Sequence, residues 1–341
     1  MIGIRVDANA EIATGHVMRC LSIANEMRRK HIDCVFITAD VFSEEIIQES
    51  GFDVILLKTP WNEMEKEIEE LVRVIKKYAI ERLIIDSYFV TVRYFDQIKI
   101  HTMIIYIDDM NLFQFPAAMI INYNIYAEKF SYPEIYHGAD TKILLGCEYA
   151  PLRSEFDSVI PLFREKVDKI LITTGGTDQL NAAGKLLGHI TKEKIFEDIE
   201  FHVVLGRLNR YAHFYHELQA KNHLIVLHQD VTTMSALITS CDIAISAGGS
   251  TLYELCACGV PTICFSFADN QLFGVKGFEE AGLMTYAGDI RTGEEECINN
   301  LIKGIDKYIY HPELRKKRSD EMRKLVDGKG ASRIVAAVMQ I

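Results

Sequence analysis

Short apolar stretches alternate with amphipathic helical stretches along this chain, and the alternation runs through two successive cycles. Apolar strands separated by helices are typical of a parallel β-sheet that is covered by helices on both faces. In the first cycle, strands are predicted at residues 2–6, 34–38, 53–57, 82–86, 103–107, 119–122 and 142–145. Helices are predicted between them at residues 16–30, 43–50, 61–78 and 92–99.

A non-periodic stretch at residues 150–163 contains Pro151 and Pro161, and we interpret it as a linker. The alternation then restarts, with strands predicted at residues 169–174, 200–205, 224–227, 242–246, 261–265 and 283–286. Helices are predicted to begin near residues 181, 210, 232, 250 and 271, and three closing helices near residues 292, 312 and 331.

The sequence therefore predicts an α/β protein of two Rossmann-like, doubly wound parallel-sheet domains, at residues 1–155 and 156–341. We expect the last helix to pack back on the first domain. Ligands bind outside the carboxyl ends of the strands in sheets of this kind. The two domains are accordingly expected to face each other across a binding cleft.

Composition narrows the classes of function. The formal net charge of −11 argues against a general nucleic-acid-binding protein. No apolar run is long enough to span a bilayer, and the first residues read as a strand rather than a signal peptide. The eight cysteines lie mostly inside apolar patterns, as reduced core thiols do. We expect a cytoplasmic protein without integral membrane contact and without structural zinc.

A glycine pair follows the apolar run at residues 243–245 and leads into a helix. Without Cβ atoms, Gly248 and Gly249 allow backbone N–H groups to approach a bound anion closely. Ser250 and Thr251 open the helix, whose unpaired N–H groups are a natural seat for phosphate. Glu254, one turn later, could accept hydrogen bonds from a ribose. The alternative is an ordinary strand–turn–helix junction.

A second turn of this type follows the strand predicted at residues 169–174. Gly175 and Gly176 could let this loop close over the phosphates from the other side. Thr177 or Asp178 could equally serve as an ordinary N-cap of the next helix. Two such turns in one domain favour an anion site more than either does alone.

An amide pair, Asn270 and Gln271, follows the strand predicted at residues 261–265. Amide side chains both donate and accept hydrogen bonds, which suits them to sugar hydroxyl and acetamido groups. The alternative is a polar N-cap region for the next helix.

The loop after the first strand carries Asp7, Gly15, His16 and Arg19. This order places them at the carboxyl edge of the first sheet, where a ligand is expected. His16 falls in the first helical turn, whose positive end disfavours a second positive charge and so favours a neutral imidazole that can act as a base. The alternative is a histidine that caps or packs at a helix start.

Further polar residues follow neighbouring strands of the first sheet. Asp86 and Tyr88 come after the fourth strand, where a carboxylate could orient His16 and a tyrosine could stack or donate a hydrogen bond. Their alternative role is to cap turns. The same two alternatives apply to residues after the next strands, namely Asp108, Asp109, Asn122 and Asn124.

Taken together, these segments resemble the PseG/SpsG family of nucleotide-sugar hydrolases and spore-coat polysaccharide proteins. The resemblance extends over nearly the whole chain, and its most discriminating part is the segment from Thr14 to Arg19. The glycine turns are shared more widely with GT-B glycosyltransferases of the MurG type. The other matching segments are residues 5–7, 84–86, 108–109, 122–124, 149–156, 175–178, 247–251 and 327–331.

The resemblance implies a GT-B architecture, with UDP held mainly by the second domain and with neither a cofactor nor a metal. It implies hydrolysis of a UDP-linked 2,4-diacetamido-2,4,6-trideoxy sugar in surface-glycan biosynthesis, of the pseudaminic acid or spore-coat kind, with His16 activating water. The catalytic residues would be His16, Asp7 and Tyr88. Residues of the substrate and UDP sites would be Gly15, Arg19, Asp86, Arg153, Gly175, Gly176, Thr177, Asp178, Gly248, Gly249, Ser250, Thr251, Glu254, Asn270 and Gln271.

The chain departs from the family pattern at two positions. Ala13 stands where the family commonly has glycine, and Ser87 stands where it commonly has histidine. The second change points to a different diacetamido sugar or to a member that no longer catalyses hydrolysis. The alternatives to a hydrolase are an inverting glycosyltransferase that uses the same base and a UDP-sugar-binding protein without catalysis.

Overall fold

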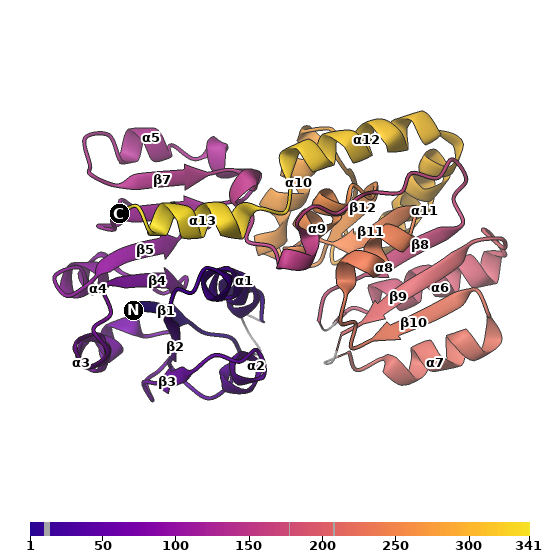
Figure 1. The fold of residues 1–341 in the computed structure, drawn as a ribbon. Coiled ribbons are helices and arrows are strands. Elements are labelled where there is room, and N and C mark those ends of the chain that lie inside the picture. Colours follow the sequence, from indigo (N-terminus) through magenta and orange to yellow (C-terminus); the bar gives the residue numbers. More distant parts are fainter. Residues whose placement is uncertain (10–13, 177, 207–208) are drawn as a thin grey trace. The chain divides into compact units, whose positions relative to one another are not determined.

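The computed structural model contains two α/β units, each built on a parallel sheet (Figure 1). It describes residues 1–9, 14–176, 178–206 and 209–341. One unit comprises Met1–Ser154 and Lys329–Ile341, and the other comprises Glu155–Gly328. The division therefore assigns the last helix, α13 (Gly330–Val338), to the first unit, where it packs against α1 (Gly15–Arg29).

The sheet of the first unit has seven strands within the described residues, in the order β3-β2-β1-β4-β5-β6-β7, and every neighbouring pair is parallel. Its strands are β1 (Ile2–Val6), β2 (Cys34–Thr38), β3 (Val54–Leu56), β4 (Arg82–Asp86), β5 (Met103–Ile107), β6 (Met119–Asn122) and β7 (Lys142–Leu145). The other helices are α2 (Glu44–Glu49), η1 (Met64–Glu67), α3 (Ile68–Tyr78), α4 (Val92–Ile98), η2 (Ala127–Lys129), α5 (Tyr132–Ile135) and η3 (Cys147–Tyr149).

The second unit begins within the 3₁₀ helix η4 (Ser154–Phe156) and repeats this plan with six described strands in the order β10-β9-β8-β11-β12-β13. Its strands are β8 (Lys169–Thr173), β9 (Glu200–Leu205), β10 (Ile225–Gln229), β11 (Ile243–Ala247), β12 (Thr262–Ser266) and β13 (Thr285–Asp289). Its helices are α6 (Ala182–Glu193), α7 (Ala212–Lys221), α8 (Met234–Ser240), α9 (Thr251–Cys258), η5 (Asp269–Gln271), α10 (Leu272–Glu280), α11 (Glu294–Tyr310) and α12 (Pro312–Leu325).

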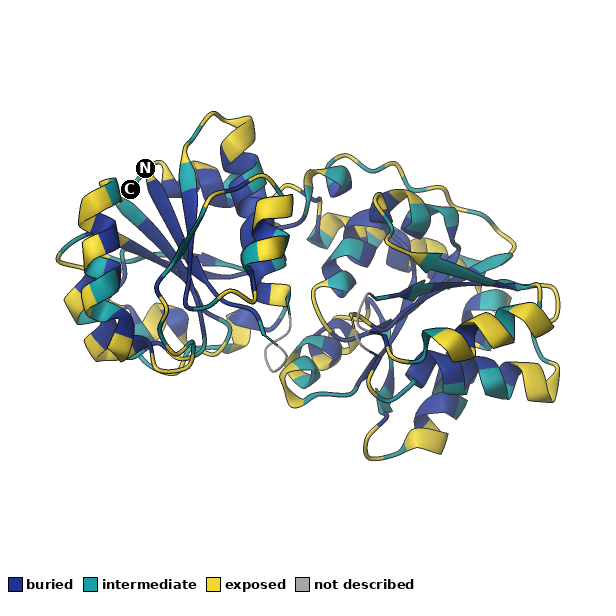
Figure 2. Cartoon of the chain, turned by 90° about the horizontal axis from the view of Figure 1, so that it is seen from below, coloured by how far each residue is buried: buried dark blue, intermediate teal, exposed yellow. Residues whose placement is uncertain are grey.

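The predicted fold class is confirmed, because the apolar runs form parallel strands, of which central ones such as β1 and β11 are buried on both faces. Figure 2 shows buried strands inside each unit and helices whose exposed residues face outward. Leu83 of β4 and Phe95 of α4, both fully buried, belong to one core cluster of the first unit. Burying a side chain of this size stabilises a fold by about 1.5–3 kcal/mol.

Each sheet has one point at which the chain changes its direction of winding. In the first sheet β1 lies beside β4, and in the second sheet β8 lies beside β11. Loops at the carboxyl ends of such strand pairs diverge and leave room for a ligand. The segment leading to His16 follows β1, Asp86 ends β4, and the two Gly-Gly turns follow β8 and β11. The four motifs singled out in the sequence therefore flank the two winding points.

A buried network of charged side chains links β1 to η1 and α4 in the first unit. Arg5 is fully buried and donates to Glu67 through Nε (2.8 Å) and Nη2 (2.6 Å). Its Nη1 donates to Asp7 (2.6 Å), and the Tyr94 hydroxyl donates to Glu67 (2.8 Å). Burial alone would lower the pKa of Arg5, but Glu67 and Asp7 hold it above its usual value. The network therefore keeps its charges inside the core.

We predict that Arg5→Met lowers the free energy of unfolding of the first unit by about 3–5 kcal/mol, because Glu67 then stays buried without its counter-charge. Trp61, the single tryptophan of the chain, lies in this unit, so urea unfolding can be followed by its fluorescence. The double variant Arg5→Met/Glu67→Met should recover part of the loss. A double variant that is no more stable than Arg5→Met would contradict this account.

Candidate functional site

His16 and Asp86 meet at the winding point of the first sheet. His16 is the second residue of α1, and its Nδ1 lies 2.5 Å from Oδ1 of Asp86 at the end of β4. Both side chains are buried, with residue exposures of 7% and 1%. A carboxylate only accepts, so Nδ1 carries the proton and the lone pair of the imidazole is on Nε2.

Arg19 binds the same carboxylate from one turn further along α1. Its Nε donates to Oδ2 of Asp86 and its Nη2 donates to Oδ1, each at 2.6 Å. Two parallel bonds of this kind are the strongest arrangement between a guanidinium and a carboxylate. Burial by itself would raise the pKa of Asp86, but Arg19 and His16 hold it well below its usual range. Asp86 is therefore ionised at neutral pH.

A second carboxylate, Asp109, closes the far side of Arg19. Nη1 of Arg19 lies 2.9 and 3.1 Å from its two oxygens. Asp109 also accepts from the Tyr88 hydroxyl (3.0 Å) and from Nδ2 of Asn124 (2.8 Å). Burial and the charge of Asp109 raise the pKa of Tyr88, so its hydroxyl remains a donor. The Tyr88 ring meets the His16 ring edge-on, with centroids 4.6 Å apart.

The charges of this cluster suit a base. Asp86 and Asp109 carry two negative charges and Arg19 carries one positive charge, so the cluster has one net negative charge while the imidazole is neutral. A proton taken up at Nε2 of His16 would bring the sum to zero. The arrangement can therefore accept a proton from a bound hydroxyl or water without creating an unmatched buried charge.

Asp7 lies outside this cluster, although the sequence suggested it as a catalytic residue beside His16. Its Oδ2 accepts from Arg5, and its Oδ1 accepts from the backbone N–H of Ala39 (2.8 Å). The carboxylate that contacts His16 is Asp86, which ends the neighbouring strand β4. Asp7 instead ties the loop after β1 to the loop after β2, which makes its contacts structural.

Two further predicted residues of the first unit have different surroundings. Gly15 is exposed at the first position of α1, and nothing lies within 4 Å of the place its Cβ would occupy. Arg153 is half-buried and follows η3 near the end of the first segment of this unit. Ser87, where the resembling family commonly has histidine, is buried, and its hydroxyl accepts from the N–H of Phe89 (3.2 Å).

The glycine turn after β11 has a backbone that only glycine adopts readily. Gly249 has φ +148°, outside the range of other residues. A Cβ on Gly248 would lie 2.8 Å from that of Gln271. Ser250 and Gly249 are exposed and lead directly into α9. The N–H groups of Leu252 and Tyr253 donate to the carbonyl oxygens of Gly249 and Ser250, so an anion at this turn would bind the N–H groups that precede them.

The turn after β8 lies at the same edge of the second sheet, because β8 and β11 are parallel neighbours. Gly175 has φ +80° and is exposed, as is Gly176. A Cβ on Gly206, in the loop after β9, would overlap the backbone of Gly176. Close backbone approach therefore fixes this turn. Thr177, which the sequence assigned to it, falls outside the described residues.

Asp178 lies in the loop before α6 and is turned toward the protein interior. It is buried, its Oδ1 accepts from the N–H of Ala182 (2.8 Å), and its Oδ2 accepts from the Tyr215 hydroxyl (2.7 Å). Asn181, not Asp178, is the N-cap residue of α6, and Asp178 binds the N–H of the first residue of this helix. Both carboxylate oxygens are thereby committed to the fold.

The remaining predicted residues of the second unit lie around the glycine turn after β11. Glu254 is half-buried one turn into α9, and Thr251 opens that helix. Gln271 is half-buried, with Oε1 accepting from the N–H of Phe267 (2.9 Å), so its amide NH₂ is the end that remains for a ligand. Asn270 is exposed in η5.

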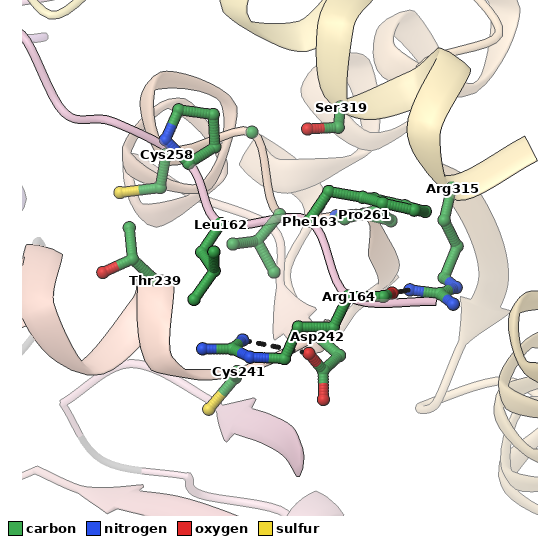
Figure 3. A pocket seen from close by; sticks show the side chains of 13 residues that line it. Leu162, Phe163, Arg164, Thr239, Cys241, Asp242, Cys258, Pro261, Arg315 and Ser319 are labelled. Carbon is green, nitrogen blue, oxygen red and sulfur yellow. Dashed lines mark hydrogen bonds and ion pairs between the residues drawn. The ribbon is translucent and has the colours of Figure 1, made fainter. Parts of the chain in front are cut away.

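A small cavity lies at the opposite, amino-terminal ends of β11 and β12 (Figure 3). It is lined by Phe163, Arg164, Asp242 and Arg315 among others, and the Arg164–Asp242 ion pair (3.0 Å) borders it. Its volume of about 20 Å³ suits a single water molecule. The cavity is therefore separate from the glycine turns and too small for a nucleotide.

In the part of the chain that the structure describes, no group of three His, Cys, Asp or Glu side chains is arranged to hold a metal ion. No helix in that part of the chain combines the length and the apolar character needed to cross a bilayer.

A family model described as "Protein of unknown function (DUF354)" matches residues 153–327, just over half of the 341 residues. The chain belongs to this family.

Comparison with known proteins identifies further relatives of this DUF354 family member. It is 25% identical over 344 residues to the "Spore coat polysaccharide biosynthesis protein SpsG" of Bacillus subtilis, covering 100% of this chain and 98% of that relative. It is 28% identical over 194 residues to the "UDP-2,4-diacetamido-2,4,6-trideoxy-beta-L-altropyranose hydrolase" of Campylobacter jejuni, covering 56% of this chain and 66% of that relative. The resemblance to the PseG/SpsG family is thereby confirmed.

The fold is also shared with a solved glycosyltransferase. MurG from Acinetobacter baumannii superposes with a TM-score of 0.68 over 100% of both chains, at 11% sequence identity. At this identity the likeness shows the fold alone. The GT-B fold class expected of this DUF354 member is confirmed.

Some members of the cluster around His16 were not assigned from the sequence. The sequence leaves Asp109 and Asn124 open between site and turn roles, and the structure brings both to Arg19 or its partner carboxylate. The sequence predicts Cys20 as an ordinary core thiol, and in the structure its Sγ lies 3.5 Å from Oδ2 of Asp86. The available signal was helical spacing, because residues three and four positions after His16 share its face of α1.

Asp86 allows a pH-dependent test of this geometry. We predict that Asp86→Asn lowers the free energy of unfolding at neutral pH by about 3 kcal/mol, because Arg19 and His16 lose their shared carboxylate. Since the pKa of Asp86 is depressed in the fold, its stabilisation is complete above the ordinary carboxyl value of about 3.9 and is lost as the pH falls through the folded value.

The difference in unfolding free energy between wild type and Asp86→Asn should therefore narrow as the pH falls from about 4 to about 2. Urea unfolding across this range measures it. The exposed Asp140 provides a control, because Asp140→Asn should change stability little at any pH. A difference that stays the same or grows over this range would contradict the depressed pKa of Asp86.

Proposed function

We propose that this chain is a nucleotide-sugar hydrolase of glycan biosynthesis. The substrate would be a UDP-linked 2,4-diacetamido-2,4,6-trideoxy sugar, and the products would be UDP and the free sugar. The observation that carries the proposal is the His16–Asp86 pair, which leaves Nε2 of a buried imidazole with its lone pair. The activity in the name of the Campylobacter jejuni relative supports the choice of substrate.

In the proposed reaction, Nε2 of His16 takes a proton from water as the water oxygen bonds to the anomeric carbon. The bond from that carbon to the diphosphate oxygen breaks, and UDP leaves with the electron pair. Asp86, bound to Nδ1, supports the imidazolium that forms. Tyr88 is also among the predicted catalytic residues, and its contact with the His16 ring suits it to hold the imidazole in place.

We propose that the second unit binds the UDP portion. The diphosphate would accept hydrogen bonds from the N–H groups that follow Gly248 and Gly249, and Glu254 would bind the ribose hydroxyls. Gly175 and Gly176 would approach the phosphates from the neighbouring strand, and Asn270 and Gln271 would contact the sugar or the phosphates. The exposure of Gly249 and Ser250 at the start of α9 supports this assignment.

The second candidate is an inverting glycosyltransferase, in which His16 deprotonates an acceptor hydroxyl instead of water. Two observations favour it: the fold shared with MurG, and Ser87, which stands in place of a family histidine and caps its own turn. Hydrolysis and transfer differ in what donates the proton to His16, so an assay with and without acceptor separates them.

We predict that wild type releases UDP from a UDP-diacetamido-trideoxy sugar without any acceptor, and that His16→Gln lowers the rate about 10²–10⁴-fold, as the loss of a general base does. UDP release is measured with a coupled assay. His31→Gln, at an exposed position just beyond α1, is the matched control and should keep the wild-type rate. Release that begins only after acceptor is added would replace the hydrolase with the transferase.

UDP binding can be tested separately from His16. We predict that Gly249→Ala weakens UDP affinity about 10-fold or more, because a side chain at φ +148° strains the turn by about 1–3 kcal/mol. Titration calorimetry with UDP measures it. Gly188→Ala, inside α6 where a Cβ meets nothing within 4 Å, is the control. Equal UDP affinity of Gly249→Ala and Gly188→Ala would show that the glycine turn is not part of the UDP site.

A further inference from the structure

Three residues on one face of α1 converge on the carboxylate of Asp86. His16, Arg19 and Cys20 stand at positions i, i+3 and i+4, which lie side by side on a helix. Cys20 is fully buried, and its Sγ lies 3.5 Å from Oδ2 of Asp86. His16 and Arg19 belong to the site of the proposed chemistry, in which the Cys20 thiol has no assigned role.

The donors divide evenly between the two carboxylate oxygens. Oδ1 faces Nδ1 of His16 and Nη2 of Arg19, and Oδ2 faces Nε of Arg19 and Sγ of Cys20. Burial first, and then the charge of Asp86, raise the pKa of the Cys20 thiol well above its usual value. The thiol therefore keeps its proton, and toward a carboxylate it can act only as a donor.

We propose that Cys20 is a positioning residue, whose thiol holds Asp86 in the orientation that presents Oδ1 to His16. By drawing charge toward Oδ2, the thiol also sets how strongly Asp86 supports a proton on the imidazole. The catalytic consequence rests on the proposed function of His16, but the effect on the imidazole does not.

Other groups around the pair remain the same in the test. Arg19 and, through it, Asp109 lie on one side of Asp86, and the Tyr88 ring lies against His16. The buried hydroxyls of Tyr106 and Tyr123 complete the surroundings, the second as an acceptor from Arg19 (3.0 Å). None of them is altered when the thiol of Cys20 is removed, so a change in His16 reports the thiol.

The experiment compares Cys20→Ala with Cys20→Ser, which are close in size and differ in whether a donor is kept. The titration of His16 is followed by ¹⁵N NMR of labelled imidazoles, with its signal assigned by its absence in His16→Gln. Without the donor, Asp86 becomes a stronger base toward the imidazole, so the His16 midpoint should rise by about half a pH unit in Cys20→Ala. Cys20→Ser should remain near wild type.

Superimposable titrations of wild type, Cys20→Ala and Cys20→Ser would overturn the proposal. If the alanine variant does not fold, Cys20→Val and Cys20→Thr provide the same comparison with a larger side chain. Cys147→Ala, which removes another buried thiol of the first unit, is the control and should leave the His16 titration unchanged.

The kinetic readout is the pH dependence of the UDP-release rate. The acidic limb for Cys20→Ala should move to higher pH by the same step as the NMR midpoint, while UDP affinity is unchanged. Absence of UDP release by wild type would overturn the proposed function and leave the NMR result to decide the role of Cys20. A shifted midpoint without a shifted acidic limb would overturn the catalytic consequence alone.

Discussion

The buried carboxylate of Asp86 is the constraint on which the first unit's candidate site depends. An ionised carboxylate inside a protein loses the hydration that stabilises it in water, and it is tolerated only where donors replace that water. Arg19 supplies two donors and His16 a third. The same bonds that make Asp86 tolerable fix the tautomer of His16, so stability and proposed chemistry come from one arrangement.

Sheet topology brings these groups together. Asp86 ends β4 and His16 begins the helix after β1, and the two strands are neighbours although β2 and β3 lie between them in sequence. The second unit uses the same device, with glycine turns after β8 and β11. A parallel sheet that changes winding direction thus brings together two loops that are distant in sequence. These loops are polar in the first unit and are built on glycine in the second.

Much of the fold could be predicted because its signal is local. Apolar runs gave β1, β2, β4 and β5 with their observed bounds, since strands buried on both faces carry no polar alternation. The sequence could not identify which carboxylate binds His16, because Asp7 and Asp86 both lie at the carboxyl ends of strands of one sheet. Which carboxylate binds His16 depends on side-chain contacts, because Arg5 donates a 2.6 Å hydrogen bond to Asp7. Cys20 was missed because an apolar pattern also explains it.

Two arginine–carboxylate networks lie on one sheet, and the contrast between them argues for the function of one. Around Arg5, the oxygens of Asp7 and Glu67 accept from Arg5, from the Tyr94 hydroxyl and from the backbone N–H of Ala39, all of which belong to the fold. Around Arg19, the chain of contacts ends on an imidazole whose bonded nitrogen is Nδ1, so Nε2 is the atom left for a reactant. Both networks contain charges that burial removes from water. Of the two, the network around Arg19 is the one that ends on a group able to exchange a proton near neutral pH.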